Sequence, residues 1–297
     1  MSYKMFSILL ILALATLACG FSVSLPKAPT PGPDVIENIT VPAPTTGATR
    51  LNINFGAGEL NLNPGAQNLV EGTATYNVPD LKPEVVTDSN GVQIKQGNLN
   101  NIPYPSNIKN IWDFKLGNTP MDLTLNAGAY SGTYELGGVS LTNLTIKDGA
   151  SNVKLAFSQA NPSEMTIFRY ETGASNVKLS GLANANFSTM IFDSGAGDYT
   201  LDFSGTLKRD ATITISSGLS NFILIIPQNV NAKVTTESGL ANINAGPGWT
   251  QNGNQYTQSG SGSTLTLQRR FTLQRRFDYY YDVLRRGVFF ERWRSFF

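Results

Sequence analysis

Apolar and polar residues alternate along most of this chain, and glycines interrupt the alternation at intervals. Leu51, Ile53 and Phe55 alternate with polar residues before Gly56, and the alternation resumes at Leu60. A period of two residues is typical of β-strands, and an interrupting glycine indicates a corner between two strands. No window shows a sustained period of 3.6 residues, so we expect very little helix.

The unit of strand, glycine corner and strand is repeated along the chain. Residues 172–179 repeat residues 148–155 almost unchanged, 24 positions later. Glycines at 149, 173, 195, 218 and 239 are spaced by 24, 22, 23 and 21 residues. A period in this range is typical of architectures in which successive turns stack on one another.

Aligning the units on their glycines shows which positions are restricted. A short polar residue follows three positions after the glycine, and apolar residues follow four and six positions after it. Stacked turns would place these residues in interior columns and a polar ladder, with glycine supplying a positive φ at the corner. The predicted corner residues are Gly56, Gly128, Gly149, Gly173, Gly195, Gly218 and Gly239, with Asn152, Asn176, Asn221 and Asn242 in the ladder.

These patterns predict an all-β, single-domain β-solenoid with about 22 residues per turn. Residues 116–267 carry the regular repeats, whereas residues 49–115 are less regular and are expected to form an N-terminal β cap. Within the cap, Val85-Val86 and Val92–Ile94 flank Asp88–Gly91, which predicts a β-hairpin.

The stretches Leu51–Leu60 and Leu69–Val78, together with the later Gly-Ala corners, resemble the bacterial toast-rack domain family. That family is related to LiaF-like and putative-adhesin β-solenoid lipoproteins. The resemblance covers about residues 49–267 and implies an extracytoplasmic β-solenoid without established enzymatic activity. It supplies no catalytic or ligand-binding residue for this chain.

The N-terminus has the pattern of a bacterial lipoprotein. Residues 1–18 combine Lys4 with a short apolar run, as in a signal peptide, and Thr16-Leu17-Ala18-Cys19 resembles a lipobox. An ordinary secretory signal is the alternative. Two acyl chains at Cys19 would suffice for stable membrane attachment. Residues 19–48 are rich in proline and are expected to form an extended tether.

The composition excludes several kinds of chemistry. The chain has no histidine and a single cysteine, which removes the commonest general base, intramolecular disulfides and thiolate metal clusters. The run Ser194–Asp198 lacks the spacing of a calcium-binding nonapeptide, and the pair Asp193 and Asp198 is weak evidence for a glycosidase. We therefore expect no catalytic residue, metal site, cofactor or nucleic-acid partner.

Residues 268–297 differ from the rest of the chain and contain eight of its eleven arginines. Thr264–Leu267 has the alternation that precedes a corner, but Gln268–Phe271 stands where a glycine turn is expected. Three interpretations remain open: a basic segment at a membrane surface, a C-terminal cap, or a disordered or out-of-frame sequence. The abrupt change in composition favours the third.

The sequence as a whole predicts a non-enzymatic, lipid-anchored cell-envelope protein with a binding, scaffolding or envelope-stress role. A surface adhesin or glycan-binding module is the alternative, and an enzyme is a third class. The expected partners are the membrane, through Cys19, and an envelope protein or cell-wall glycan. The aromatic residues that could contact a glycan are more readily explained as core; they are Trp112, Tyr130, Tyr134, Tyr170, Tyr199 and Trp249.

Lipidation of Cys19 can be tested with Cys19→Ser. We expect the variant to lose lipoprotein processing and to leave the membrane fraction, because the thiol that carries the lipid is gone. Mass spectrometry of the mature N-terminus, with membrane fractionation, measures both effects. Processing and membrane partition equal to the parent protein would contradict the prediction.

Overall fold

The computed structural model describes residues 30–45, 47–89, 91–97, 107–237 and 244–271. It is an all-β protein with two short 3-10 helices, Pro79–Leu81 and Leu182–Ala185. Among the described residues, no helix has the length and apolar character needed to cross a membrane. The strands are β1 (Val35–Val41), β2 (Thr49–Pro64), β3 (Val70–Tyr76), β4 (Pro83–Asp88), β5 (Gly91–Gln96), β6 (Asn110–Leu116), β7 (Met121–Glu135), β8 (Leu141–Ala156), β9 (Met165–Ser180), β10 (Phe187–Asp202), β11 (Ala211–Ser217), β12 (Ser220–Ile225), β13 (Asn231–Glu237), β14 (Thr250–Asn252), β15 (Gln255–Gln258) and β16 (Thr264–Phe271).

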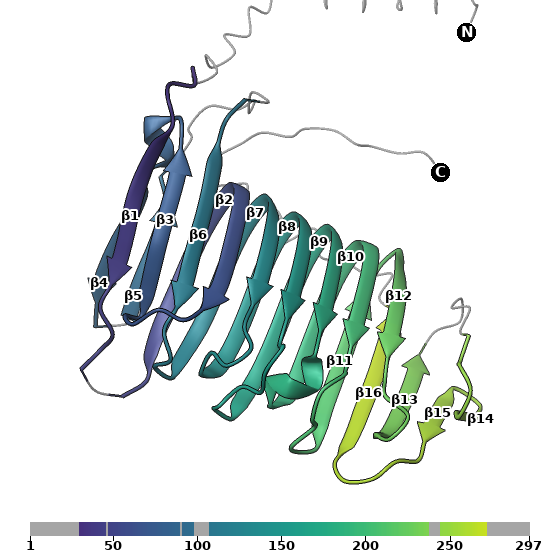
Figure 1. Cartoon of the computed structure of the whole chain (residues 1–297). Helices are drawn as coiled ribbons and strands as arrows, with labels where there is room; N and C mark the ends of the chain where they lie inside the picture. The colour runs from purple at the N-terminus through teal and green to yellow at the C-terminus, as the bar shows by residue number, and fades with distance from the viewer. Residues whose placement is uncertain (1–29, 46, 90, 98–106, 238–243, 272–297) are drawn as a thin grey trace, which may run out of the picture.

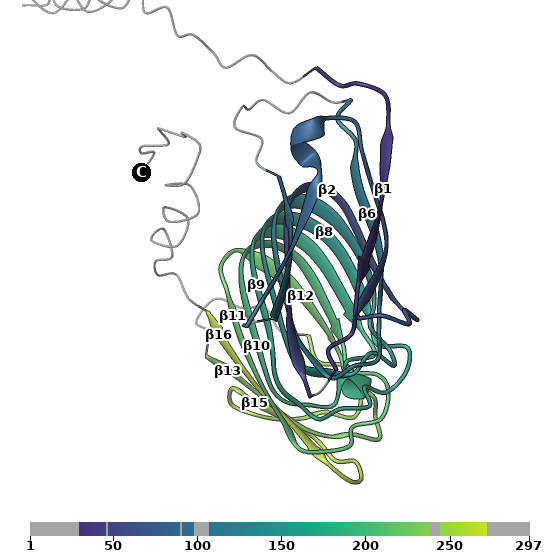
Figure 2. The ribbon, with the colours of Figure 1, turned by 90° about the vertical axis from the view of Figure 1, so that its left-hand side faces the viewer.

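Five long strands, β2 and β7 to β10, form the centre of the molecule. Each pairs in parallel with the next, and the register continues through the corner into the second half of the strand. The strands therefore lie side by side as successive turns of a solenoid (Figure 1). Viewed along the stack, the two halves of each turn form the two walls of the body (Figure 2). This arrangement is the β-solenoid that the sequence predicts.

The interior consists of columns of equivalent apolar residues. Val153, Val177 and Tyr199 occupy one column, each at most 1% exposed. Leu155, Leu179 and Leu201 occupy the column two positions further on. The side chains alternate between core and surface because successive residues of a strand point to opposite faces. The interior columns predicted from the repeat are therefore present.

The corner glycines are required for a different reason from the one expected. Gly56, Gly128, Gly195 and Gly218 do not have the positive φ expected from the sequence; Gly58 and Gly197, two positions on, have φ values of 129° and 146°. Instead, a Cβ at Gly195 would lie under 3.0 Å from the carbonyl oxygen of Gly173 in the preceding turn. Close stacking of the corners thus excludes a side chain at this position.

The start of the solenoid and the extent of the tether also differ from expectation. β2 is itself the first turn of the solenoid, since it pairs with β7 from Thr49 to Leu62. The cap is formed by β1, β3 and β6 on one half of β2 and by β4 and β5 on the other. β1 pairs with β3 along its whole length, so the expected tether is incorrect over residues 35–41. The predicted hairpin is confirmed as β4 and β5.

The C-terminal turns do not follow the order of the sequence. The repeat predicts that residues 231–237 stack on residues 211–217, but β16 lies between β11 and β13 and pairs in parallel with both. Leu265 and Leu267 of β16 are 1% and 0% exposed, so the position of β16 between two strands buries these two large aliphatic side chains. The solenoid also continues to Phe271, beyond the predicted boundary at residue 267.

Close stacking of the corners predicts a large effect of Gly195→Ala. The added methyl would collide with the backbone of Gly173, and we expect a loss of about 2–3 kcal/mol of unfolding free energy. Gly246→Ala is the matched control, since no atom lies within 4 Å of a Cβ there. Urea unfolding followed by circular dichroism measures both variants, and equal stability of the two would contradict the prediction.

Candidate functional site

The halves of the long strands that follow the corner form one wall of the solenoid, which we call the second wall; the halves before the corner form the first wall. The predicted asparagine ladder lies on the outer surface of the second wall. Asn152 is in register with Asn176, Asn176 with Asp198, and Asp198 with Asn221. All four side chains are exposed. Lys154 and Lys178, two positions further on, are also in register with each other and exposed. This wall therefore presents rows of polar side chains at the spacing of the strands, about 4.8 Å.

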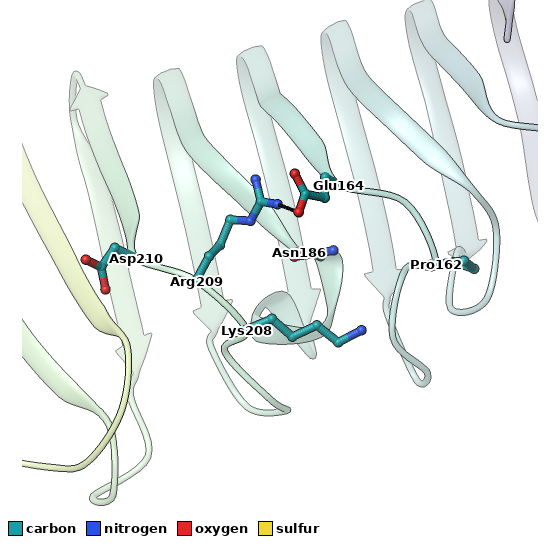
Figure 3. Close-up of a pocket in the computed structure, with 6 residues that line it drawn as sticks. All are labelled: Pro162, Glu164, Asn186, Lys208, Arg209 and Asp210. Atoms are coloured by element: carbon teal, nitrogen blue, oxygen red, sulfur yellow. Dashed lines mark ion pairs between the residues drawn. The ribbon is translucent and has the colours of Figure 1, made fainter.

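An open hollow of about 680 Å³ lies beside the loops that connect β8 to β11 (Figure 3). Its lining is polar and contains two cationic and two acidic side chains. Arg209 pairs with Glu164 at 2.5 Å, and Figure 3 shows its guanidinium directed toward that carboxylate. Asp210 accepts a hydrogen bond from the backbone N–H of Thr264 at 2.7 Å. The lining residues are Pro162, Glu164, Asn186, Lys208, Arg209 and Asp210.

Asn186 is a buried polar residue in the wall of this hollow. It has a φ of 57°, in the left-handed region that asparagine tolerates better than most residues. Its Nδ2 donates to the carbonyl of Ser163 at 2.9 Å. Its buried Oδ1 has no hydrogen-bond partner among the described residues. Because that oxygen is buried, the groups of the hollow that suit the carboxylates of a ligand are the cations of Lys208 and Arg209.

A second group of polar side chains lies inside the corner of β7, β8 and β9. The carboxylate of Asp148 accepts hydrogen bonds from Tyr170 Oη at 2.9 Å and from Ser151 Oγ at 3.0 Å. Thr172 Oγ1 and, at 3.3 Å, Tyr130 Oη also donate to it. Tyr134 Oη donates to Tyr130 Oη at 3.0 Å. We call this group, Asp148 with Tyr130, Tyr134, Tyr170, Thr172 and Ser151, the hydroxyl cluster.

Burial changes the acidity of the hydroxyl cluster. Loss of solvent raises the pKa of Asp148, and hydrogen bonds from Thr172, Tyr170 and Ser151 oppose that rise without cancelling it. Burial likewise raises the pKa of Tyr130 and Tyr170 well above their ordinary value, so these phenols remain protonated donors. The cluster joins three successive turns, and its carboxyl group is occupied by the protein's own hydroxyls.

The role of Asp148 was not predicted from the sequence. This residue opens the first copy of the near-identical repeat, where the second copy has Thr172, and the structure places these two residues in register and in contact. The change from Asp to Thr within an otherwise repeated stretch was the available signal. The expectation that Trp112, Tyr130, Tyr134, Tyr170 and Tyr199 belong to the core is confirmed, since all are buried. Trp249 is only partly buried against that core.

Three predicted site residues, Cys19, Gly239 and Asn242, lie outside the described residues. Asp193 and Asp198, considered as a carboxylate pair, lie on opposite sides of the corner of β10, and Asp193 is 4.0 Å from Arg169.

Comparison with known families identifies the architecture. The N-terminal domain of toast_rack, DUF2154, matches residues 30–180, about half of the chain. The chain belongs to this family. The matched region begins before β1 and ends with β9, so it includes the N-terminal cap and the hydroxyl cluster. Asn186, Lys208 and Arg209 of the polar hollow lie beyond it.

A solved structure shares this fold. A protein from Clostridium sporogenes ATCC 15579, described as a putative cell adhesion protein, aligns with a TM-score of 0.51 and 20% identity, covering 80% of this chain and 95% of its own. A putative adhesin from Bacteroides fragilis NCTC 9343 has a TM-score of 0.29 and 7% identity, covering 82% of this chain and all of its own, a likeness too low to support an argument. No curated protein matches the chain significantly.

The raised pKa of Asp148 predicts a pH dependence of stability. The native state binds this proton more tightly than the unfolded chain, so the contribution of Asp148 is most favourable below its ordinary pKa of 3.8 and declines as the pH rises through the native value. We expect the unfolding free energy of the parent protein, minus that of Asp148→Asn, to fall between pH 3 and pH 7. The fall amounts to about 1.4 kcal/mol for each tenfold difference in proton affinity between the native and the unfolded chain.

Urea unfolding of both proteins across this pH range measures the difference. Asp198→Asn, which removes an exposed carboxylate outside the hydroxyl cluster, is the matched control. A difference for Asp148→Asn that stays constant, or that grows toward pH 7, would contradict the assignment.

Proposed function

We propose that this chain is a non-enzymatic cell-envelope protein, anchored by lipid at Cys19, whose solenoid acts as a scaffold in envelope binding or stress response. The observation that carries the non-enzymatic part is the placement of its carboxyl groups. Asp148, the described carboxyl group with a raised pKa, is enclosed by hydroxyls of three turns. A general acid must reach its substrate, and this one is occupied within the fold.

The hollow supports the same conclusion. Its two carboxylates are engaged, Glu164 with Arg209 and Asp210 with the backbone of Thr264. Glycoside hydrolysis requires two carboxyl groups that face the substrate, and both of these contact the protein's own groups instead. The rigid, in-register body offers instead long polar surfaces, which suit binding to an extended partner.

The proposed location, anchored by lipid on the outer side of the membrane, rests on the sequence. The signal peptide, the cysteine and the proline-rich residues that precede β1 would carry the body to the outer side of the membrane and hold it away from the lipid. Chemical cross-linking in intact cells, followed by purification of the protein, tests the scaffold role. We expect membrane proteins to be recovered with the parent protein and to be lost with Cys19→Ser; hydrolysis of envelope polysaccharide by the purified body would overturn the proposal.

A glycan-binding or adhesin role is the second candidate, and the polar hollow favours it. Lys208 supplies a cation there, and Arg209, which pairs with Glu164, supplies a second. Together they suit a glycan that carries carboxylates, because cations bind the acid groups.

Co-sedimentation with insoluble cell-wall material tests this second role. If the hollow binds glycan, Lys208→Ala/Arg209→Ala should reduce the bound fraction at least tenfold. Lys154→Ala/Lys178→Ala removes the same number of cations from the outer surface of the second wall and serves as the matched control. Equal binding by both double variants and the parent protein would exclude the hollow as the glycan site.

A further inference from the structure

The strand β16 is inserted between two strands of successive turns. β11 and β13 follow one another in the repeat, and β16 pairs in parallel with both of them. Figure 1 shows β16, in yellow, between the green strands β11 and β13. From β2 to β11, by contrast, each strand of the first wall pairs directly with the strand of the next turn. β16 therefore interrupts a stack that otherwise follows the order of the sequence.

β11 and β13 share one register despite the strand between them. Leu265 of β16 is in register with Ala211 on one side and with Ala232 on the other. Ala232 follows Ala211 by 21 positions, which is also the spacing of the last two corner glycines of the repeat. A move of β13 by one strand spacing, about 4.8 Å, would thus pair it directly with β11. Its register, and the face that it turns to the core, would not change.

The connection that enters β13 favours such a move. Residues 226–230 join β12 to β13 across two strand spacings, because β16 takes the place next to β11. Residues 136–140, a connection of the same length, join β7 to β8 across a single spacing. Departure of β16 would let the two connections have the same span.

The inner face of β16 both stabilises and opposes its insertion. Leu265 and Leu267 are fully buried, and removal of their apolar surface from water stabilises the inserted strand. Arg269, the next inward-facing residue, is half-buried, with its guanidinium 5.0 Å from the ring centroid of Phe222. Burial lowers the pKa of Arg269, and no carboxylate of the described residues counters that shift. A charge removed from water without an acidic partner is costly, so the two effects oppose each other.

Two polar side chains hold the beginning of β16 in place. Asp210 Oδ1 accepts a hydrogen bond from the backbone N–H of Thr264 at 2.7 Å. Asn231 Oδ1 accepts one from the N–H of Gly260 at 2.8 Å, and its Nδ2 donates to the carbonyl oxygen of Gly262 at 3.1 Å. These hydrogen bonds are exposed to solvent, so water can replace them when the strand leaves.

We infer that β16 is an exchangeable strand, and that the protein has a second arrangement in which β16 leaves the sheet and β13 pairs directly with β11. β15 and β14 move with β13, to which they are joined by antiparallel pairing. The released strand carries Leu265 and Leu267 on one face and unpaired backbone groups, which suit addition to an open strand of a partner. The exchange goes beyond the proposed function, because it holds whether the body acts as a scaffold or as an adhesin.

Disulfide trapping tests the exchange in the full chain with Cys19→Ser. Thr212 and Lys233 are exposed and lie on either side of β16, about 9.6 Å apart. In the second arrangement they are neighbours at about 4.8 Å, within disulfide range. We expect Thr212→Cys/Lys233→Cys to form an intramolecular disulfide under mild oxidation, identified by mass spectrometry. Asp210→Ala in the same chain should accelerate its formation at least tenfold, because the hydrogen bond to Thr264 is lost.

Thr189→Cys/Thr266→Cys is the matched control, since β11 separates these positions by the same distance and stays in the sheet. Thr212→Cys/Thr266→Cys, on adjacent strands, should cross-link and shows that the oxidation is effective. Three results would each overturn the inference: no disulfide from Thr212→Cys/Lys233→Cys, equal yields from this pair and the matched control, or exclusively intermolecular disulfides.

Hydrogen exchange gives a measurement without cysteines. We expect the amides of β16 to exchange at least tenfold faster than those of β13, because β13 remains paired with β15 and gains β11 as a partner when β16 leaves. Equal exchange of β13 and β16 would mean that the end of the solenoid opens as one unit, and it would contradict the exchange of a single strand.

Discussion

The close parallel stacking of successive corners is the constraint on which the rest of the structure depends. The corner at Gly195 leaves no space for a side chain against the carbonyl of Gly173. Successive turns can therefore lie as close together as hydrogen-bonded strands of a sheet. This contact transmits the register of one half of a turn to the other. Because the register continues through each corner, equivalent residues form columns, and interior columns bury apolar side chains without a hydrophobic core in any single turn.

The same stacking makes the hydroxyl cluster possible. Asp148 and Thr172 meet because they occupy equivalent positions of consecutive turns, and Tyr130 and Tyr170 reach the carboxylate from the turns on either side. A buried carboxyl group is costly unless its acceptor sites are filled, and here hydroxyls fill them. The interaction ties three turns together at their corner, where the apolar columns are interrupted.

The ends of the stack require separate solutions because a solenoid exposes strand edges. At the N-terminal end, β1, β3 and β6 extend one wall and β4 and β5 extend the other. The C-terminal end is asymmetric, with β16 inserted between β11 and β13 and with β12 as the last of the described strands in its wall. Arg269 lies over the ring of Phe222 at this margin, which places a charged group at the boundary between core and solvent.

The sequence alone predicts the class of fold, since the period of two specifies strands and the glycine spacing specifies stacked turns. It also determined the interior columns and the cap hairpin, because each depends on residues close together in a repeat. The reason why the glycines are needed lies in contacts between turns, since the clash at Gly195 comes from another turn. The contacts of Asp148 and the place of β16 likewise depend on residues brought together from distant positions, a choice that local alternation does not encode.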